Sequence, residues 1–458
     1  SKGGAGGLFR IASFVNFRSE NNSYYNNFSG DIGGAYYFYK GGQAACKIDL
    51  TNPSKKRSII FKNDEFKGNS SGVSLGKGDG GAVYIGTYST DIPCSVTIEN
   101  CNFKENYCTA FEGGAVWLSV GGEVNIKNSI FCGNKANTKG SSGTGAGGAM
   151  RVVNASKLTI EGSYFSENWT PKGGGAIEIE TGNEFLIRNT VFIGNKCEEG
   201  AEATGGIIYP SGGAITVPAG YGKFSNCKFV NNESRTFGGA VSIRNNDKQI
   251  DNPIVFENCQ FEGNKTINGG AIGSIANKHE VQINNCIFKN NTAYGFQKAG
   301  NGGGVIAQSD LSKGVVIKNS TFEGNVSQGR GGVVWYSAGY LHSENNQYYN
   351  NSGIDGGVFY AETPLPSNDK GLVSISDVFY GNTSEPVNNK GYGNGGAVNM
   401  DIAQTKTVIF RNSVFVNNTA KQTATDYSKG GARKGGGGAI YFNCGKGAGA
   451  VNPLIDEM

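Results

Sequence analysis

Long hydrophobic runs, proline and an excess of one charge are all scarce in this 458-residue sequence. It has no stretch of about 18 apolar residues, the minimum for a helix that crosses a bilayer, and only 10 prolines. Its 41 basic and 37 acidic residues are interspersed, so the basic stripe typical of nucleic-acid binding is missing. Glycine is abundant, at 74 residues, but follows no Gly-X-Y period, which excludes collagen. We therefore expect no transmembrane segment and no nucleic-acid partner.

Two short motifs alternate along nearly the whole chain. In the first, a Gly-Gly pair precedes a small and then an apolar residue, and it begins at Gly33, Gly80, Gly113, Gly147, Gly174, Gly212, Gly238, Gly269, Gly302, Gly331, Gly356, Gly395 and Gly437. In the second, an aromatic residue is followed three positions later by Asn, and it begins at Tyr24, Phe66, Phe103, Phe131, Phe165, Phe192, Phe229, Phe261, Phe288, Phe322, Tyr348, Phe379 and Phe415. Such regular alternation indicates a repeat architecture.

Apolar residues within each repeat recur at every second position, which is the period of a β-strand. Val116 and Leu118 illustrate the first such pair after the glycines, Val124 and Ile126 the second, and Phe131 continues the same face. No segment has the period of a helix. The repeats therefore predict an all-β parallel β-helix of about 13 coils, with three short strands per coil and variable loops after the Phe-x-x-Asn motif. At about 4.8 Å per coil the rod would be roughly 60 Å long.

We predict that residues 1–458 form one continuous β-helix, with a C-terminal cap or docking segment at 443–458. Val, Ile and Leu would fill the bore, the aromatic residues would stack, and the asparagines would form hydrogen-bonded ladders at the turns. The Gly-Gly pair would mark a corner that tolerates no side chain or needs positive φ.

The combined motifs, such as GGAI from Gly174 with FIGN from Phe192, resemble the repeat of the polymorphic outer-membrane proteins of chlamydiae and related protist surface proteins. The resemblance extends from about Tyr24 to Phe442. It implies a right-handed β-helix at the cell surface that acts in adhesion and self-association. The sequence departs from that family in lacking a visible C-terminal outer-membrane barrel, so the resemblance indicates the fold more firmly than the function.

Catalysis is the main alternative, because many β-helices degrade polysaccharides. A glycosidase needs two neighbouring carboxyl groups, whereas the acids here are scattered, among them Asp247, Asp251, Asp310, Asp355 and Asp401. The two histidines, His279 and His342, lie in different repeats, and the motifs of polygalacturonases are absent. We predict a non-enzymatic chain without catalytic residues, cofactor or metal.

The ten cysteines form two groups. Four of them hold one position, two residues before the Phe, where other repeats have Ser or Thr: Cys101, Cys227, Cys259 and Cys286. This interchange indicates a buried thiol, although a disulfide between Cys259 and Cys286 would also fit the coil spacing. Among the rest, Cys108 and Cys132 are the pair that we expect to bridge neighbouring coils.

Asn-x-Ser/Thr sequons are numerous. Candidate glycosylation sites are Asn27, Asn69, Asn154, Asn168, Asn232, Asn264, Asn325 and Asn382. Further sequons begin at Asn21, Asn290, Asn319, Asn350 and Asn417. The alternative is that Asn serves as a turn residue. A buried asparagine ladder and a glycan on the same residue are incompatible.

A row of aromatic residues stands four positions after the first glycine in several repeats: Tyr37, Tyr84, Trp117, Trp335 and Tyr360. Exposed, this row would bind sugar rings or side chains of a partner. Covered by a loop, it would only stabilise the sheet, and we favour this second interpretation.

These features predict a non-catalytic extracellular surface or matrix protein with an adhesive or structural role. Its partners would be surface glycans or proteins, or other copies of itself through end-to-end or lateral association. One alternative is the subunit of a head-to-tail filament, because uncapped β-helix ends expose unpaired strand edges. Another is a polysaccharide lyase or hydrolase, which an exposed cluster of carboxylates would favour.

Overall fold

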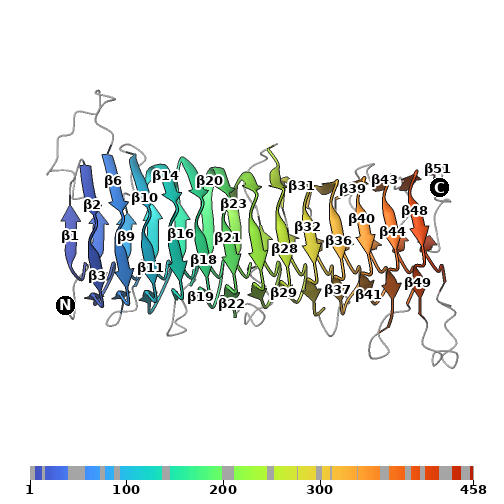
Figure 1. The fold of residues 1–458 in the computed structure, drawn as a ribbon, viewed down its shortest axis with the longest axis horizontal. Coiled ribbons are helices and arrows are strands. Elements are labelled where there is room, and N and C mark those ends of the chain that lie inside the picture. Colours follow the sequence, from blue (N-terminus) through green and yellow to red (C-terminus); the bar gives the residue numbers. More distant parts are fainter. Residues whose placement is uncertain are drawn as a thin grey trace. The chain divides into compact units, whose positions relative to one another are not determined.

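The structure is a computed structural model. It describes residues 6–12, 16–39, 57–72, 78–86, 93–136, 145–198, 211–244, 252–275, 277–295, 302–309, 312–337, 339–361, 371–386, 393–402, 408–421, 436–444 and 454–456. The chain forms two compact units, Ser1–Lys228 and Phe229–Met458. In each unit, corresponding strands of successive coils lie side by side and pair in parallel (Figure 1), which confirms the predicted parallel β-helix.

The strands of the first unit fall into four classes. After the glycine corner come β1 (Phe9–Ala12), β5 (Tyr36–Tyr39), β9 (Val83–Gly86), β13 (Val116–Ser119) and β16 (Met150–Val153). The second class is β2 (Asn16–Glu20), β6 (Arg57–Lys62), β10 (Cys94–Glu99), β14 (Gly121–Lys127) and β17 (Lys157–Glu161). Both positions are spanned by β20 (Ile177–Arg188) and β23 (Ile215–Ser225). The aromatic strands are β3 (Ser23–Tyr25), β7 (Glu65–Lys67), β11 (Asn102–Lys104), β15 (Ile130–Cys132), β18 (Tyr164–Ser166) and β21 (Val191–Ile193).

The structure adds a fourth strand immediately after the asparagine of the Phe-x-x-Asn motif. This strand has only two residues, which is too short for an alternating pattern to reveal it in the sequence. In the first unit these strands are β4 (Phe28–Ser29), β8 (Ser70–Ser71), β12 (Tyr107–Cys108), β19 (Trp169–Thr170) and β22 (Lys196–Cys197). The strand β24 (Lys228–Val230) begins at the last residue of this unit.

The second unit repeats these classes. Its first strands are β26 (Val241–Ile243), β30 (Ile272–Ile275), β34 (Ile306–Ser309), β38 (Val334–Tyr336), β42 (Phe359–Ala361), β46 (Val398–Ile402) and β50 (Ile440–Cys444). Its second strands are β27 (Ile254–Glu257), β31 (Glu280–Asn284), β35 (Gly314–Lys318), β39 (Leu341–Glu344), β43 (Leu372–Ile375), β47 (Val408–Arg411) and β51 (Leu454–Asp456).

The remaining strands of this unit follow the same order. The aromatic strands are β28 (Gln260–Glu262), β32 (Ile287–Lys289), β36 (Thr321–Glu323), β40 (Gln347–Tyr349), β44 (Val378–Tyr380) and β48 (Val414–Val416). The fourth strands are β25 (Glu233–Ser234), β29 (Lys265–Thr266), β33 (Thr292–Ala293), β37 (Val326–Ser327), β41 (Ser352–Gly353), β45 (Thr383–Ser384) and β49 (Thr419–Ala420). In the segment 443–458, β51 pairs in parallel with β47 and so extends the row of second strands.

The glycine corner has two separate requirements. Gly113 has a φ of 65°, a conformation that L side chains rarely adopt. Gly114 follows it, and a Cβ on this residue would collide with the carbonyl oxygen of Gly148 in the next coil. The first glycine therefore makes the turn, and the second allows adjacent coils to approach each other.

Stacked aromatic rings and asparagine amides line the interior. In the first unit Phe66, Phe103, Phe131 and Phe165 stack with centroids 4.6–4.8 Å apart. Beside them the buried amide of Asn134 accepts hydrogen bonds at Oδ1 from the backbone N–H and Nδ2 of Asn106, both at 3.0 Å. Its Nδ2 donates to Phe103 O and to Asn168 Oδ1, also at 3.0 Å. Every hydrogen-bonding position of the amide is therefore used.

Replacing one rung of this ladder should destabilise the fold. Asn134→Ala would leave the buried backbone N–H and Nδ2 of Asn106 and the carbonyl of Phe103 without the side-chain partner that Asn134 supplies, at a cost of about 1–3 kcal/mol for each unsatisfied group. We expect a clear fall in the urea midpoint. Asn125→Ala, on the outer side of β14 in the same coil, is the matched control and should have little effect. Equal midpoints for the two variants would contradict the structural role of the ladder.

Candidate functional site

The predicted aromatic row is covered rather than exposed. Tyr84, Trp117, Trp335 and Tyr360 are at most 8% exposed, and Tyr37 is half-buried. Trp117 stacks on Tyr84 at a centroid distance of 4.5 Å, and its indole N–H donates to Glu112 Oε2 at 3.3 Å. The binding-surface interpretation of this row is therefore wrong: its aromatic faces are used within the protein.

A charged cluster centred on the half-buried Arg151 continues the same row. Arg151 is in register with Trp117 in one neighbouring coil and with Glu178 in the other. Its guanidinium forms ion pairs with Glu112, Glu178 and Glu180. Burial raises the pKa of Glu178 to about 7, although the charge of Arg151 lowers it and that of Glu180 raises it.

A second carboxyl group of the first unit is perturbed in the same direction. Burial raises the pKa of Asp79 to about 7, opposed by Arg151 and reinforced by Asp31. Its Oδ1 accepts the backbone N–H of Glu112 at 3.1 Å. Raised carboxyl pKa values occur at catalytic sites, but Glu178 is buried and Asp79 is half-buried, so these two carboxylates do not form the exposed cluster that would favour an enzyme.

The two histidines have local roles. His279 is buried, with Nδ1 2.6 Å from Asn252 O, and burial lowers its pKa. His342 lies 3.4 Å from Glu344 on the surface of β39. Among the predicted acids, Asp355 is buried and its Oδ1 accepts the N–H of Asn394. Asp247, Asp251 and Asp310 lie outside the described residues.

Within the described ranges, no three His, Cys, Asp or Glu side chains are grouped so that they could hold a metal ion. Nor does any helix there have the length and apolarity to cross a membrane.

Most candidate glycosylation sites are rungs of the asparagine ladder. The side chains with no exposed surface are Asn69, Asn168, Asn232, Asn264, Asn325 and Asn382. A glycan bonded to Nδ2 would break the donation to the next coil, for example from Asn168 to Asn195 at 2.9 Å. These six predicted sites are incompatible with the folded structure. Asn27 is half-buried and donates to Asn69, whereas Asn154 is exposed.

Neither cysteine pair proposed as a disulfide is bridged in the structure. Cys108 is buried on β12, whereas Cys132 is half-buried on β15, so the structure does not bring them together as a bridge. Cys286 Sγ instead accepts the backbone N–H of Cys259 at 3.4 Å. Ser163 plays the same part for Ser129, which explains why Cys and Ser interchange at this position. The buried-thiol interpretation fits this position, and burial raises the pKa of the Cys101 thiol to about 12.

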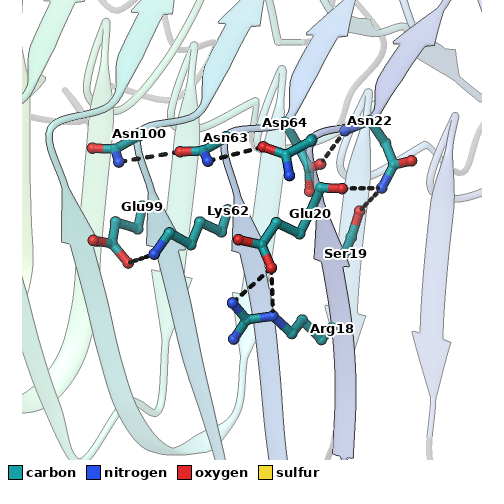
Figure 2. Close-up of polar contacts among 10 residues, drawn as sticks. Arg18, Ser19, Glu20, Asn22, Lys62, Asn63, Asp64, Glu99 and Asn100 are labelled. Atoms are coloured by element: carbon teal, nitrogen blue, oxygen red, sulfur yellow. Dashed lines mark hydrogen bonds and ion pairs between the residues drawn. The ribbon is translucent and has the colours of Figure 1, made fainter.

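Asp64 occupies the same position in its own coil. Its Oδ1 accepts the backbone N–H of Asn22 at 2.8 Å (Figure 2). On the adjacent outer turn, Asn100 donates to Asn63 at 3.2 Å, and Lys62 forms an ion pair with Glu99 at 3.8 Å. Hydrogen bonds and ion pairs thus connect corresponding positions of successive coils both in the interior and on the outer surface.

Pairing of opposite charges between coils is common on the exterior. Lys157 meets Glu184 at 3.1 Å, and Arg188 meets Glu161 at 2.8 Å. The second unit shows the same arrangement at Lys289 and Glu323, 3.2 Å apart. These pairs neutralise each other and offer little net charge to a ligand.

A different exterior row, formed by the residue after each ladder asparagine, combines aromatic rings with cations. Parallel pairing places Tyr107, Lys135, Trp169 and Lys196 on consecutive coils. Tyr107, Lys135 and Lys196 are exposed, and Trp169 is half-buried. We call these four residues the aromatic–lysine row. All four residues directly follow the Asn of the Phe-x-x-Asn motif, and this shared position is a sequence signal that could have identified them. Their neighbours suggest other roles instead, because Asn168, beside Trp169, begins a sequon and Cys108, beside Tyr107, is a disulfide candidate.

This row borders a surface hollow of about 490 Å³. The described residues that line it are Lys135, Glu167, Asn168, Trp169, Gly194 and Lys196. On the neighbouring aromatic strands, Ile130 and Tyr164 are in register and are 42% and 37% exposed. A half-buried indole between two exposed lysines makes this hollow the strongest candidate for ligand binding in the described part of the first unit.

Two family models match the chain. That of the right-handed beta helix region matches residues 134–311. That of the Chlamydia polymorphic membrane protein repeat matches residues 412–443. The chain is therefore a right-handed parallel β-helix that resembles the polymorphic membrane protein repeat family, as its motifs indicated. No curated protein and no solved structure shows significant similarity to it.

The raised pKa of Glu178 predicts how stability depends on pH. The unfolded side chain ionises near its usual pKa of 4.5, whereas the folded one ionises near 7. The folded state therefore holds the proton more tightly between these values, and the free energy of unfolding falls as the pH rises from about 4.5 to 7.

Glu178→Gln should remove this contribution, so the fall in urea midpoint between pH 5 and pH 8 should be smaller than in the parent protein. Asp79 would account for a residual dependence. Glu184→Gln on the same strand β20 is the control, because its side chain is 50% exposed. An unchanged pH dependence in Glu178→Gln would show that this residue is not perturbed by burial.

The ladder also predicts which sequons can carry a glycan. Folded protein secreted from a eukaryotic host should be unmodified at Asn168 and Asn264, whose amides are buried, whereas the exposed Asn154 and Asn290 can accept a glycan. Mass spectrometry of glycopeptides before and after glycosidase treatment measures this. A glycan on Asn168 in material that unfolds cooperatively would contradict the ladder.

Proposed function

We propose that the chain is a non-catalytic, extracellular surface protein that adheres to other molecules through the side of its β-helix. The match to the Chlamydia polymorphic membrane protein repeat supports a surface location. The observation that carries the adhesive role is the aromatic–lysine row, because its exposed Lys135 and Lys196 and its half-buried Trp169 line one hollow.

The β-helix suits this role because its rows are rigid. Lys135 and Trp169 follow the buried ladder residues Asn134 and Asn168 directly, so the backbone of the row is held by the amide hydrogen bonds beneath it. A ligand that binds here does not have to order a flexible loop, which reduces the entropic cost of association.

The lack of catalysis is part of the proposal. The strongly perturbed carboxyl groups are the buried Glu178 and the half-buried Asp79, both influenced by Arg151, whereas Glu167 is the one acidic side chain among the described residues that line the hollow. Glycoside hydrolysis by the common mechanism uses a pair of carboxyl groups. The hollow therefore suits binding better than bond cleavage.

Adhesion can be measured directly with coated beads. Beads that carry the purified folded chain should bind to cultured epithelial cells several times more than beads coated with albumin. Beads that carry the heat-denatured chain are a second control. Binding no greater than that of the albumin beads would overturn the adhesive role and leave a structural role. Electron microscopy of the same preparation tests the predicted end-to-end filament.

A further inference from the structure

We propose that the aromatic–lysine row binds an acidic polysaccharide. A sugar ring would pack on Trp169, and the carboxylate or sulfate groups of the flanking sugars would pair with Lys135 and Lys196. This inference rests on the proposed adhesive function and specifies its ligand class and site.

The geometry places one aromatic ring between two cations. The backbone of Lys135 is in parallel β-register with that of Trp169 in the next coil, and Trp169 is in register with Lys196 in the coil after that. With coils about 4.8 Å apart, the two lysine positions are about 10 Å apart along the row. An extended chain with an acidic group on alternate sugars could span this distance with one ring over the indole.

The hollow gives the ligand room in the middle of this row. Gly194 has no side chain to fill the space beside Trp169 and Lys196. Glu167, at the corresponding position one coil earlier, is exposed and lines the same hollow. Its carboxylate would repel an anionic group but accept a hydrogen bond from a sugar hydroxyl. A carbohydrate offers both kinds of group, which a simple anion does not.

The surroundings favour a polysaccharide over nucleic acid. On the described second strands near the hollow, Lys157 and Arg188 each face an acidic side chain in an adjacent coil, so these two cations add little net positive charge. Nucleic-acid affinity comes mainly from many phosphate contacts. Two lysines beside Glu167 supply too few phosphate contacts for nucleic acid. A half-buried indole flanked by two cations instead suits a single sugar ring with acidic sugars on either side.

Binding to immobilised polygalacturonate, hyaluronan and heparin, with dextran as the neutral comparison, tests the proposal by biolayer interferometry. At least one acidic polysaccharide should bind more tightly than dextran, and added salt should weaken this binding. Trp169→Ala and the double variant Lys135→Gln/Lys196→Gln should each reduce the affinity by about tenfold or more. Trp169→Phe, which keeps a ring, should retain part of it.

The second unit supplies a matched control. Lys265 also follows a ladder asparagine and is exposed, but it is in register with Glu233 and Thr292 rather than with aromatic residues. Lys265→Gln should therefore bind like the parent protein. Circular dichroism and the urea midpoint show whether each variant is folded.

Three results would overturn the inference: equal binding of dextran, affinity of Trp169→Ala within twofold of the parent, or equal binding of duplex DNA of matched charge. The bead assay separates this failure from that of adhesion. If Trp169→Ala beads still adhere to cells as the parent does, the chain adheres through another surface. If parent beads do not adhere at all, the proposed function itself fails.

Discussion

The hydrogen bonds of the buried asparagine ladder fix the register on which the other rows depend. An amide such as that of Asn134 is satisfied only when Asn106 and Asn168 lie directly before and after it in the stack. A slip of one residue would turn each rung toward solvent and leave backbone groups unpaired in the interior. The ladder therefore selects one alignment of coils, and the stacked rings of Phe103 and Phe131 follow the same alignment.

Fixed register makes each outward position a row with its own chemistry. In one row Arg151 and Glu178 pair with little exposed surface, and in another Lys157 and Glu184 neutralise each other at the surface. The position occupied by Ser129 and Ser163 accepts a backbone N–H from the preceding coil, so any small side chain with an acceptor is tolerated. Residues far apart in sequence thus cooperate because the coils bring them within contact distance.

The same arrangement explains how a thin β-helix could adhere without a deep cleft. Trp169 is held on a rigid edge, and Lys135 lies one coil from it, so a short segment of an extended ligand meets several groups at once. Because Glu167 borders the hollow as well, the site offers both hydrogen bonding and charge. Additional binding energy would come from repeated contacts along an extended ligand rather than from enclosure of one small molecule.

The sequence by itself determined the repeat, the parallel β-helix, the inward aromatic stack and the asparagine ladder, because identical motifs at every turn can be satisfied together only by stacking. It left open which outward rows are covered, because Trp117 and Lys135 both lie at outward positions of the repeat. Only the tertiary structure shows that Trp117 donates a hydrogen bond to Glu112 and is buried, whereas Lys135 is exposed. It likewise left open whether Asn168 is a rung or a glycosylation site. Burial decides both, and burial depends on contacts between coils that no single repeat contains.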